Sequence, residues 1–407
     1  CDLKTLYPLA RSMNRKLEFY VGPTNSGKTY NAMKKLKEAN SGLYLAPLRL
    51  LALEGYEDLK ESNIEASLIT GEEQQLSEDA AHICSTIEML DFDLEVDVAV
   101  IDEVQMLEDN DRGWAWVNAI IGVPAKKVIM TGSVNALEAV KRIVQYLDEE
   151  LEVVRHKRKN PLLVLQKWTP LEKLENGTAL IAFSRAEVLK LKQKLQKKYS
   201  VSVIYGNLSP EVRRDEARRF RDGQSQILIA TDAISMGLNL PIKTILFTTD
   251  TKFDGVSKRK ISVNEIVQIA GRAGRFGLFE AGYLGATRRD VLEYIKEEFE
   301  APIKTIKPPF KVKINNSQLE NLSMHLKTKS LGKVLNFFAL NMKFAGPFEA
   351  ANLSSMLEAS RIVDSKDGLS LEEKYLLAQA PITTKSTIIV QAYSSYIASV
   401  IKKRPNH

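Results

Sequence analysis

The amino-acid sequence predicts an α/β protein with two successive parallel-sheet domains and an all-helical C-terminal domain. From Leu17 to about Val154, short β-rich runs alternate with helical patterns, and the alternation starts again at TALIAF, residues 178–183. This alternation is typical of a parallel sheet with crossover helices. After Pro302 the β-rich runs stop and apolar residues recur at three- and four-residue spacing, which indicates helices. We therefore expect an N-terminal segment at residues 1–16, α/β domains at 17–158 and 159–300, and a helical domain at 301–407.

The individual elements are predicted as follows. The strands of the first domain are LEFYVG, GLYL, ASLI, VDVAVID, KKVIMTG and LEVV, and those of the second are TALIAF, VSVIYG, QILIAT, KTILFT and AGYLGA. The polar stretch RHKRKNP, residues 155–161, separates the two sets. The segments NSQLENLSMHL, LGKVLNFFALNM and SLEEKYLLAQ are the predicted C-terminal helices. The run TKFDGVSKRKIS predicts a hairpin or loop whose Lys258, Arg259 and Lys260 either bind phosphates or form a solvated basic surface.

Length and composition exclude several classes of protein. A chain of 407 residues exceeds the size of one hydrophobic core. No stretch approaches the roughly 20 apolar residues that cross a bilayer, so we expect no membrane association. Cys1 and Cys84 are too few for a disulfide framework, which favours a reducing compartment. The net charge of +6 permits a polyanionic partner without requiring one.

The run GPTNSGKT follows the first predicted strand and precedes a helical pattern. Glycines let the backbone wrap around phosphate oxygens, which the N–H groups at the start of the helix then bind. Lys28 would reach the β- and γ-phosphates of ATP, and Thr29 would hold Mg²⁺. An ordinary glycine-rich turn is the weaker alternative, given the strand and helix on either side. The predicted ATP-binding residues are Gly22, Pro23, Thr24, Asn25, Ser26, Gly27, Lys28 and Thr29.

An acidic pair ends the predicted strand VDVAVI. Ligands of open α/β sheets bind at the carboxyl ends of the strands, where Asp102 and Glu103 would lie. Asp102 would hold Mg²⁺ together with Thr29, and Glu103 would orient and deprotonate the attacking water. The alternative is a helix N-terminal cap, which two acidic residues after a strand often form.

The run QIAGRAGRFG, residues 268–277, places two arginines three residues apart, so that on a helix both would project from one face. Two guanidinium groups from the second domain could stabilise charge on the γ-phosphoryl group during hydrolysis. Solvated surface arginines are the alternative. The loop ATDAISMGLNLP would lie between ATP and a bound strand, with Gly237 near the nucleotide. The expected catalytic residues are Lys28, Asp102, Glu103, Gln268, Arg272 and Arg275.

These motifs, in this order, resemble those of superfamily-two helicases, whose fold is two tandem RecA-like domains. They are GPTNSGKT, LAPLRLLALE, TGEE, STIEML, DEVQ, IAFSRAE, ATDAISMGLNL and QIAGRAGR. DEVQ in place of DEAD or DEAH, PLRLLALE, and KFDG before VNEIVQIAGRAGRFG resemble the Suv-three-like RNA helicases of the mitochondrial degradosome and their bacterial relatives. The likeness continues into NMKFAGPFEAANL and LSLEEKYLLAQAPI, and so covers nearly the whole chain.

The resemblance implies an ATP- and Mg²⁺-dependent RNA helicase that moves 3′ to 5′ on single-stranded RNA and unwinds duplexes with overhangs. The motor would serve RNA turnover and tolerate different nucleotides. Contacts to the strand's backbone would fix position without reading sequence. The residues that match the family's strand-binding motifs are Pro47, Leu48, Arg49, Thr70, Gly71, Thr86, Ser184, Arg185, Gly206 and Thr231.

Two departures from related helicases limit the inference. TGS, residues 131–133, replaces the SAT of DEAD-box proteins, which puts a coupling role for this loop in doubt, and no Q-type adenine motif precedes Val21. We therefore assign no adenine contact and expect weak base selectivity.

Several alternatives stay open at the level of sequence. A DNA translocase with the same motor and an idle RNA-binding scaffold are the rival functions, because a fold does not fix its substrate. We expect a monomer, and an exoribonuclease partner is open. Since the motor begins close to the start of the sequence, a bacterial cytoplasmic protein is expected, with the mitochondrial matrix as the alternative.

Overall fold

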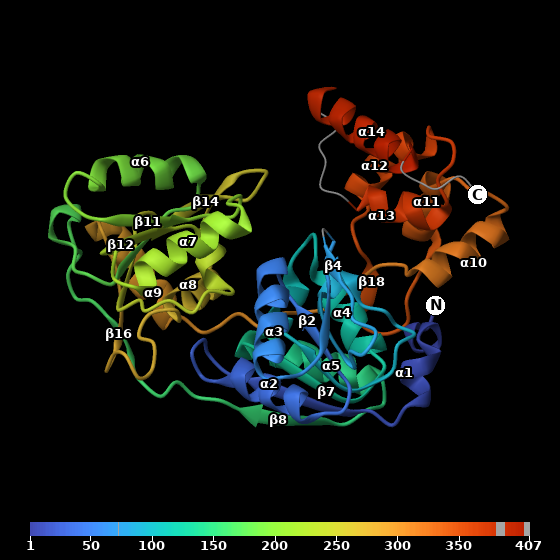
Figure 1. The fold of residues 1–407 in the computed structure, drawn as a ribbon, viewed down its shortest axis with the longest axis horizontal. Coiled ribbons are helices and arrows are strands. Elements are labelled where there is room, and N and C mark those ends of the chain that lie inside the picture. The colour runs from blue at the N-terminus through green and yellow to red at the C-terminus, as the bar shows by residue number, and fades with distance from the viewer. Residues whose placement is uncertain (72, 380–386, 403–407) are drawn as a thin grey trace.

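The computed structural model describes residues 1–71, 73–379 and 387–402. Figure 1 shows three lobes: a blue-to-teal lobe at the bottom centre, a green-to-orange lobe on the left and an orange-to-red helical lobe at the upper right. The first two are the predicted α/β domains. The helices and two short strands of the third lobe follow them in the sequence.

The first domain contains an eight-stranded sheet in the order β4-β3-β5-β2-β6-β7-β1-β8. All neighbours pair in parallel except β4, which is antiparallel to β3. Strand β5 was not predicted, because the polar residues of HICST interrupt its apolar run. The bounds are β1 Lys16–Val21, β2 Gly42–Ala46, β3 Ala66–Ile69, β4 Gln74–Gln75, β5 His82–Thr86, β6 Val96–Ile101, β7 Ala125–Gly132 and β8 Leu151–Arg155.

Helices cover both faces of this sheet, which is why its central strands are apolar throughout. Helices α2 (Lys28–Glu38) and α3 (Arg49–Glu61) pack on one face. Helices α1 (Pro8–Ser12), α4 (Gly113–Gly122) and α5 (Leu137–Tyr146) pack on the other. The N-terminal residues 1–16 are therefore packed on the first domain through Leu3, Tyr7 and Ala10 in its core.

The second domain has a six-stranded parallel sheet in the order β11-β12-β10-β13-β16-β9. A separate antiparallel hairpin follows β13, as the basic run predicted. The strands are β9 Leu162–Val164, β10 Thr178–Ile181, β11 Val201–Ile204, β12 Ile227–Ala230, β13 Thr244–Phe247, β14 Thr251–Phe253, β15 Lys258–Lys260 and β16 Gly282–Ala286. The helices are α6 Arg185–Leu195, α7 Pro210–Arg221, α8 Val263–Ala270 and α9 Arg289–Glu300.

The C-terminal lobe has a helical core, but the prediction of an all-helical domain was wrong in one respect. Strands β17 (Phe310–Val312) and β18 (Phe348–Ala350) pair in parallel. At three residues each, they are too short to leave a pattern in the sequence, and they bury Phe310, Val312 and Phe348 in the core of the first domain. The helices are α10 Asn316–Leu326, α11 Leu331–Asn341, α12 Ser354–Asp364, α13 Leu371–Ala378 and α14 Thr387–Lys402. The final residues of LSLEEKYLLAQAPI lie outside the described residues.

Candidate active site and nucleic-acid interface

The glycine-rich loop connects the carboxyl end of β1 to the start of α2. Gly27 has a φ of +84°, a conformation that L side chains rarely adopt, and the helix begins at the next residue. The Lys28 ammonium is buried and donates a 3.0 Å hydrogen bond to the Pro23 carbonyl. Burial lowers the pKa of Lys28, while the carboxylates of Glu103 and Asp102 act against that shift. A buried lysine held between a phosphate loop and two carboxylates is suited to bind a nucleotide's terminal phosphates.

The predicted metal ligands are adjacent. The Thr29 hydroxyl lies 3.3 Å from Asp102 Oδ1, at the end of β6. Thr131 donates to the same carboxylate at 2.5 Å, and Tyr44 donates to its other oxygen at 2.6 Å. Burial, and then the charge of Glu103, raise the pKa of Asp102. A cation would relieve this buried negative charge, so one carboxylate and one hydroxyl fit Mg²⁺, which takes its remaining ligands from phosphates and water.

Glu103 is positioned by its backbone. It has a left-handed φ of 57°, and its main-chain N–H donates to the Thr131 hydroxyl at 3.1 Å. Its side chain makes no capping bond to the following 3-10 turn, Val104–Glu108, and is instead hydrogen-bonded by Gln105. The helix-cap alternative for Glu103 therefore has no support in the structure.

The TGS loop at 131–133 contacts this site although its sequence departs from related helicases. Thr131 bonds both acidic residues, and the Ser133 N–H donates to Gln105 Oε1 at 3.2 Å. The loop is thus hydrogen-bonded to the DEVQ segment, and its role in coupling stays untested by these contacts.

The loop that carries Arg272 and Arg275, called the arginine loop below, differs from the prediction. Helix α8 ends at Ala270, so Arg272 and Arg275 do not share a helical face. Gly274 has a φ of +76°, and a Cβ there would lie 2.4 Å from the Gly282 nitrogen, so the chain must turn away from the helix at this point. The two arginines consequently have different surroundings.

Arg272 reaches the ATP site from the second domain. Its guanidinium is buried, which lowers its pKa, while the charges of Glu103 and Asp102 oppose that shift. Its Nε donates to the Ser235 carbonyl at 3.1 Å. Arg275 is half-buried, and its side chain forms no hydrogen bond or ion pair with any residue that the structure describes. The structure therefore brings one of the two predicted arginines to the acidic pair.

Direct contacts join the phosphate loop to the arginine loop. The Asn25 amide donates to the Gly271 carbonyl at 2.9 Å. A Cβ on Gly271 would lie 2.7 Å from the Cβ of Thr24, so glycine is required for this close approach. Ser26 is turned inward and donates to the Pro23 carbonyl at 2.6 Å. Residues predicted to bind ATP thus form the interface between the two domains.

Sequence reasoning missed the contribution of the interdomain linker. Arg158 donates to the carbonyls of Gly271 and Ala273, both at 2.7 Å. The His156 N–H donates to the Val21 carbonyl at 2.8 Å, and its ring lies 2.9 Å from the Asn31 amide. The basic composition of the run RHKRKNP was the available signal, but it did not reveal that Arg158 binds the arginine loop and that His156 contacts the strand and helix on either side of the phosphate loop.

Six of the predicted strand-binding residues lie on the first domain. They follow β2, β3 and β5, which are neighbours in the sheet, so that parallel pairing brings their carboxyl ends to one edge. The Thr70 hydroxyl and main chain contact Glu73, which also pairs with Arg49 at 3.3 Å. The residues brought to this edge are Pro47, Leu48, Arg49, Thr70, Gly71 and Thr86.

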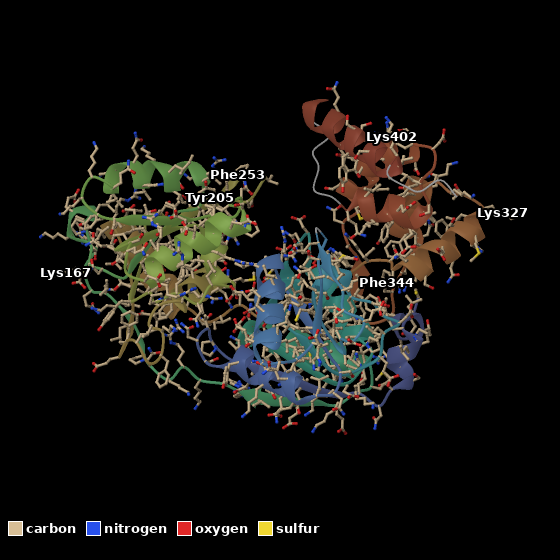
Figure 2. All side chains as sticks on the ribbon, in the orientation of Figure 1. Lys167, Tyr205, Phe253, Lys327, Phe344 and Lys402 are labelled. Carbon is tan, nitrogen blue, oxygen red and sulfur yellow. The ribbon has the colours of Figure 1, made fainter. Side chains whose placement is uncertain are left out.

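A hollow of about 470 Å³ gathers the predicted strand-binding residues of the second domain, and Leu48 of the first domain also lines it. Gly206 has open space where a Cβ would stand, so packing does not explain the absence of a side chain there. The Arg185 guanidinium lies 5.6 Å over the Tyr205 ring. Figure 2 labels Tyr205 on the side of the second domain that faces the other two lobes. The predicted residues that line the hollow are Leu48, Ser184, Arg185, Gly206 and Thr231.

The hollow also contains residues that were not among the predicted strand-binding residues. Arg213 on α7 donates to the carbonyls of Tyr205 and Gly206, and burial lowers its pKa. Asp232 lines the same hollow and pairs with Lys252 of the hairpin at 2.7 Å. Arg213 lies outside the quoted motifs, so only the folded chain identifies it, whereas Asp232 belongs to the motif ATDAISMGLNL.

Two predicted ATP-site residues lie away from the acidic pair. Gly237 has a φ of +97°, and a Cβ there would be 3.5 Å from Leu51 of α3, so it sits at the domain interface. Gln268 is half-buried on α8 and makes no side-chain hydrogen bond within the described part of the chain. Their assigned roles stay predictions.

Among the described residues, no helix is long and apolar enough to span a membrane.

Two tandem parallel-sheet domains, in which the phosphate loop of one contacts the arginine loop of the other, are typical of helicases. Residues 4–156 match the DEXQ-box helicase domain of Suv3, and residues 161–277 match the helicase conserved C-terminal domain. The chain belongs to the Suv3 family of ATP-dependent RNA helicases, as its motifs had indicated.

Curated relatives agree with this assignment, and a solved structure has a similar fold. The mitochondrial DExH-box ATP-dependent RNA helicase DExH16 of Arabidopsis thaliana is 36% identical over 98% of this chain and 70% of its own length. The mitochondrial ATP-dependent RNA helicase SUV3 of Candida albicans is 36% identical over 94% of this chain, which spans 55% of that relative. The fold resembles S. cerevisiae Dbp5 bound to RNA and ADP BeF3, with a TM-score of 0.53 and 17% identity over 81% of this chain and 91% of that one.

Proposed function

We propose that this chain hydrolyses ATP to move 3′ to 5′ along single-stranded RNA and to separate paired strands, in RNA turnover. One observation carries this proposal: the same two domains meet both at the ATP site and at the hollow that contains the predicted strand-binding residues. Leu48 of the first domain lines the hollow that contains Ser184 and Thr231 of the second, while Asn25 and Gly271 join the domains at the phosphate loop. Any change at one contact therefore changes the geometry of the other.

Hydrolysis would depend on the groups around the phosphate loop. Lys28 would bind the terminal phosphates, and Thr29 with Asp102 would hold Mg²⁺, which neutralises phosphate charge when bound. Glu103 would take a proton from the attacking water. Arg272 would stabilise charge on the γ-phosphoryl group, and Arg275 would join it when the domains close.

Movement would follow from closing and opening of the domain interface. ATP favours the closed arrangement because both domains contribute groups to its phosphates. After hydrolysis the arginine loop loses its partner, so the second domain can release and shift along the strand. Gln268 and Gly237, on the second domain near this interface, are proposed to assist the nucleotide side of the cycle.

The partners and location are also proposals. The relatives' names support a mitochondrial location, so we favour the mitochondrial matrix over the bacterial cytoplasm. We propose that the motor acts as a monomer on RNA with a single-stranded overhang. An exoribonuclease that degrades the released strand would fit a role in RNA turnover.

The proposal is tested by the steady-state ATPase rate with no nucleic acid, single-stranded RNA, single-stranded DNA or duplex DNA, with Lys28→Ala as the inactive control. We expect strong stimulation by RNA and unwinding of a 3′-overhang duplex in preference to a 5′-overhang duplex. Stimulation only by duplex DNA would replace this function with that of a DNA translocase. No ATP hydrolysis with any nucleic acid would instead favour an RNA-binding scaffold that does not act as an enzyme.

A further inference from the structure

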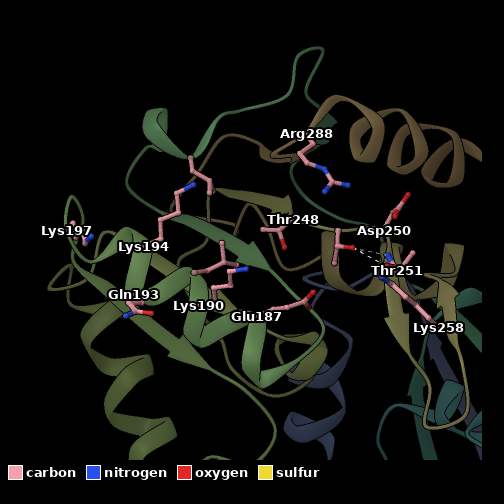
Figure 3. A pocket seen from close by; sticks show the side chains of 13 residues that line it. Glu187, Lys190, Gln193, Lys194, Lys197, Thr248, Asp250, Thr251, Lys258 and Arg288 are labelled. Carbon is pink, nitrogen blue, oxygen red and sulfur yellow. Dashed lines mark hydrogen bonds between the residues drawn. The ribbon is translucent and has the colours of Figure 1, made fainter.

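A second groove lies on the second domain, outside the predicted strand path. It has a volume of about 830 Å³ and is bounded by α6, the ends of β13 and β14, and Arg288 before α9. Figure 3 shows the lysines of α6 on one side, Thr251 and Lys258 on the other, and Arg288 above them. Apart from Glu187, which ends the motif IAFSRAE, none of its lining residues belongs to the quoted helicase motifs.

The groove carries an excess of unpaired positive charge. Its lining includes four lysines, at 190, 194, 197 and 258, none of which forms an ion pair within the described residues. Of its two acidic groups, Asp250 is neutralised by Lys260, which lies outside the lining. Arg288 is likewise paired with Asp290. Glu187 alone remains to oppose the four lysines, so a polyanion would be attracted here.

Two of these lysines lie one turn apart on α6. Lys190 and Lys194 have i, i+4 spacing and so lie on one face of the helix, about 6 Å apart along its axis. Lys197 follows in the turn just after the helix ends at Leu195. Thr248, Thr249 and Thr251 offer hydroxyl groups on the opposite wall. A row of point charges facing hydroxyl groups suits a backbone with repeated phosphates rather than a single anion.

The hairpin β14–β15 separates this groove from the loaded strand's hollow. Side chains alternate between the two faces of a strand. Lys252 projects to one face and pairs with Asp232, which lines the hollow. Thr251 and Lys258 project from the other face and line the basic groove. One face of the hairpin therefore contributes residues to the basic groove, and its opposite face contacts a residue of the hollow.

We propose that this basic groove binds the phosphate backbone of the complementary strand as it leaves the duplex. The inference rests on the proposed helicase function and adds a second nucleic-acid site to it. The loaded strand occupies the hollow at Ser184 and Thr231, and the hairpin keeps the other strand on its opposite face. Ser184 and Arg185 lie at the start of α6, the helix that also carries lysines of the basic groove. The proposed paths of the two strands therefore diverge near the start of this helix.

The test compares the double variant Lys190→Ala/Lys194→Ala with Lys167→Ala/Lys192→Ala. The control removes the same charge from the same domain, but neither of its lysines lines the groove. Affinity for a 3′-overhang RNA duplex and for its single-stranded loading strand is measured over a range of salt concentrations. Lys167, Lys190 and Lys194 are exposed and Lys192 is half-buried, and thermal unfolding of both variants checks that the fold is intact.

We expect the groove variant to bind the duplex several-fold more weakly, while its affinity for the single strand and its single-strand-stimulated ATPase stay unchanged. The slope of log affinity against log salt should fall by about 1.4 to 1.8, as two lost phosphate contacts predict. Unchanged duplex binding relative to the control would overturn the proposal and leave an acidic protein as the candidate occupant. Equal loss for duplex and single strand would also overturn it. Absence of RNA-stimulated ATPase in the unmodified chain would instead contradict the proposed function.

Discussion

The indole Nε1 of Trp116 donates a 2.8 Å hydrogen bond to the main-chain oxygen of Asp102. The Arg112 guanidinium lies 5.3 Å over the same indole ring and donates to the Pro47 carbonyl at 2.7 Å. It also pairs with Glu88 at 2.6 Å, just beyond the end of β5. Two side chains thus connect the proposed metal ligand to two loops that are predicted to hold RNA.

The variant Arg112→Ala should uncouple RNA binding from hydrolysis. Without the guanidinium the Pro47 carbonyl and Glu88 lose their shared donor, and the RNA concentration for half-maximal ATPase stimulation should rise roughly tenfold, since hydrogen bonds to charged groups contribute about 1.5–3 kcal/mol. ATPase activity without RNA should stay near that of the unmodified protein. Arg112→Lys is the matched variant: it keeps the charge but cannot hold both acceptors, and full activity in it would contradict the role.

The variant Glu103→Gln should bind ATP and fail to hydrolyse it. The amide keeps the size of the side chain but cannot accept a proton, and loss of a general base costs roughly 10²- to 10⁴-fold in rate. Single-turnover hydrolysis beside equilibrium nucleotide binding separates the two steps. Turnover at the unmodified rate would remove Glu103 from the mechanism.

The variant Arg275→Ala should retain ATP and RNA binding and lose about 10³-fold or more of its RNA-stimulated hydrolysis, as expected of an arginine that acts on the transferred phosphoryl group. Arg289→Ala is a suitable control, because that side chain lies on α9 and is 82% exposed. If hydrolysis with saturating RNA is equal in the two variants, Arg272 acts without Arg275.

The variant Glu54→Gln should stabilise the protein above neutral pH. Burial at the domain interface raises the pKa of Glu54 from 4.5 to about 7, against the opposing charge of Arg221. A raised acid pKa favours the folded state below pH 4.5, and that contribution is lost as the pH rises through about 7. The amide removes the cost of ionisation, so the free energy of unfolding should increase by about 1–2 kcal/mol at pH 8 and change little at pH 4.5. Thermal unfolding at both pH values checks the sign, and an equal shift at both would exclude ionisation as its cause.

Much of the fold follows from local sequence signals, and its exceptions have physical causes. Apolar runs such as VDVAVI are strands because both faces of a parallel sheet are buried. Strand β9 was missed since it has only three residues and pairs with β16, far along the chain. The run TKFDGVSKRKIS was predicted to form a hairpin or a loop, and the structure shows the hairpin β14–β15.

In the site, too, continuous sequence motifs were predictable and contacts between residues far apart in the sequence were not. The phosphate loop and acidic pair are predictable because each is a continuous segment with its own chemistry. The contacts of Arg158 with the arginine loop join residues 113 and 115 positions apart, and no local pattern reports such a distance. The helical face assigned to Arg272 and Arg275 failed because Gly274 supports a turn that spacing alone does not show.

The burial of β17 and β18 in the first domain gives the second domain two covalent attachments to the same body. The chain leaves the first domain at residues 156–161 and returns to it at residues 301–309, which form no helix or strand. The second domain is in effect an insertion held at both ends. Two connections restrain the position of the second domain more than a single linker would, because displacement at one end is opposed by the attachment at the other.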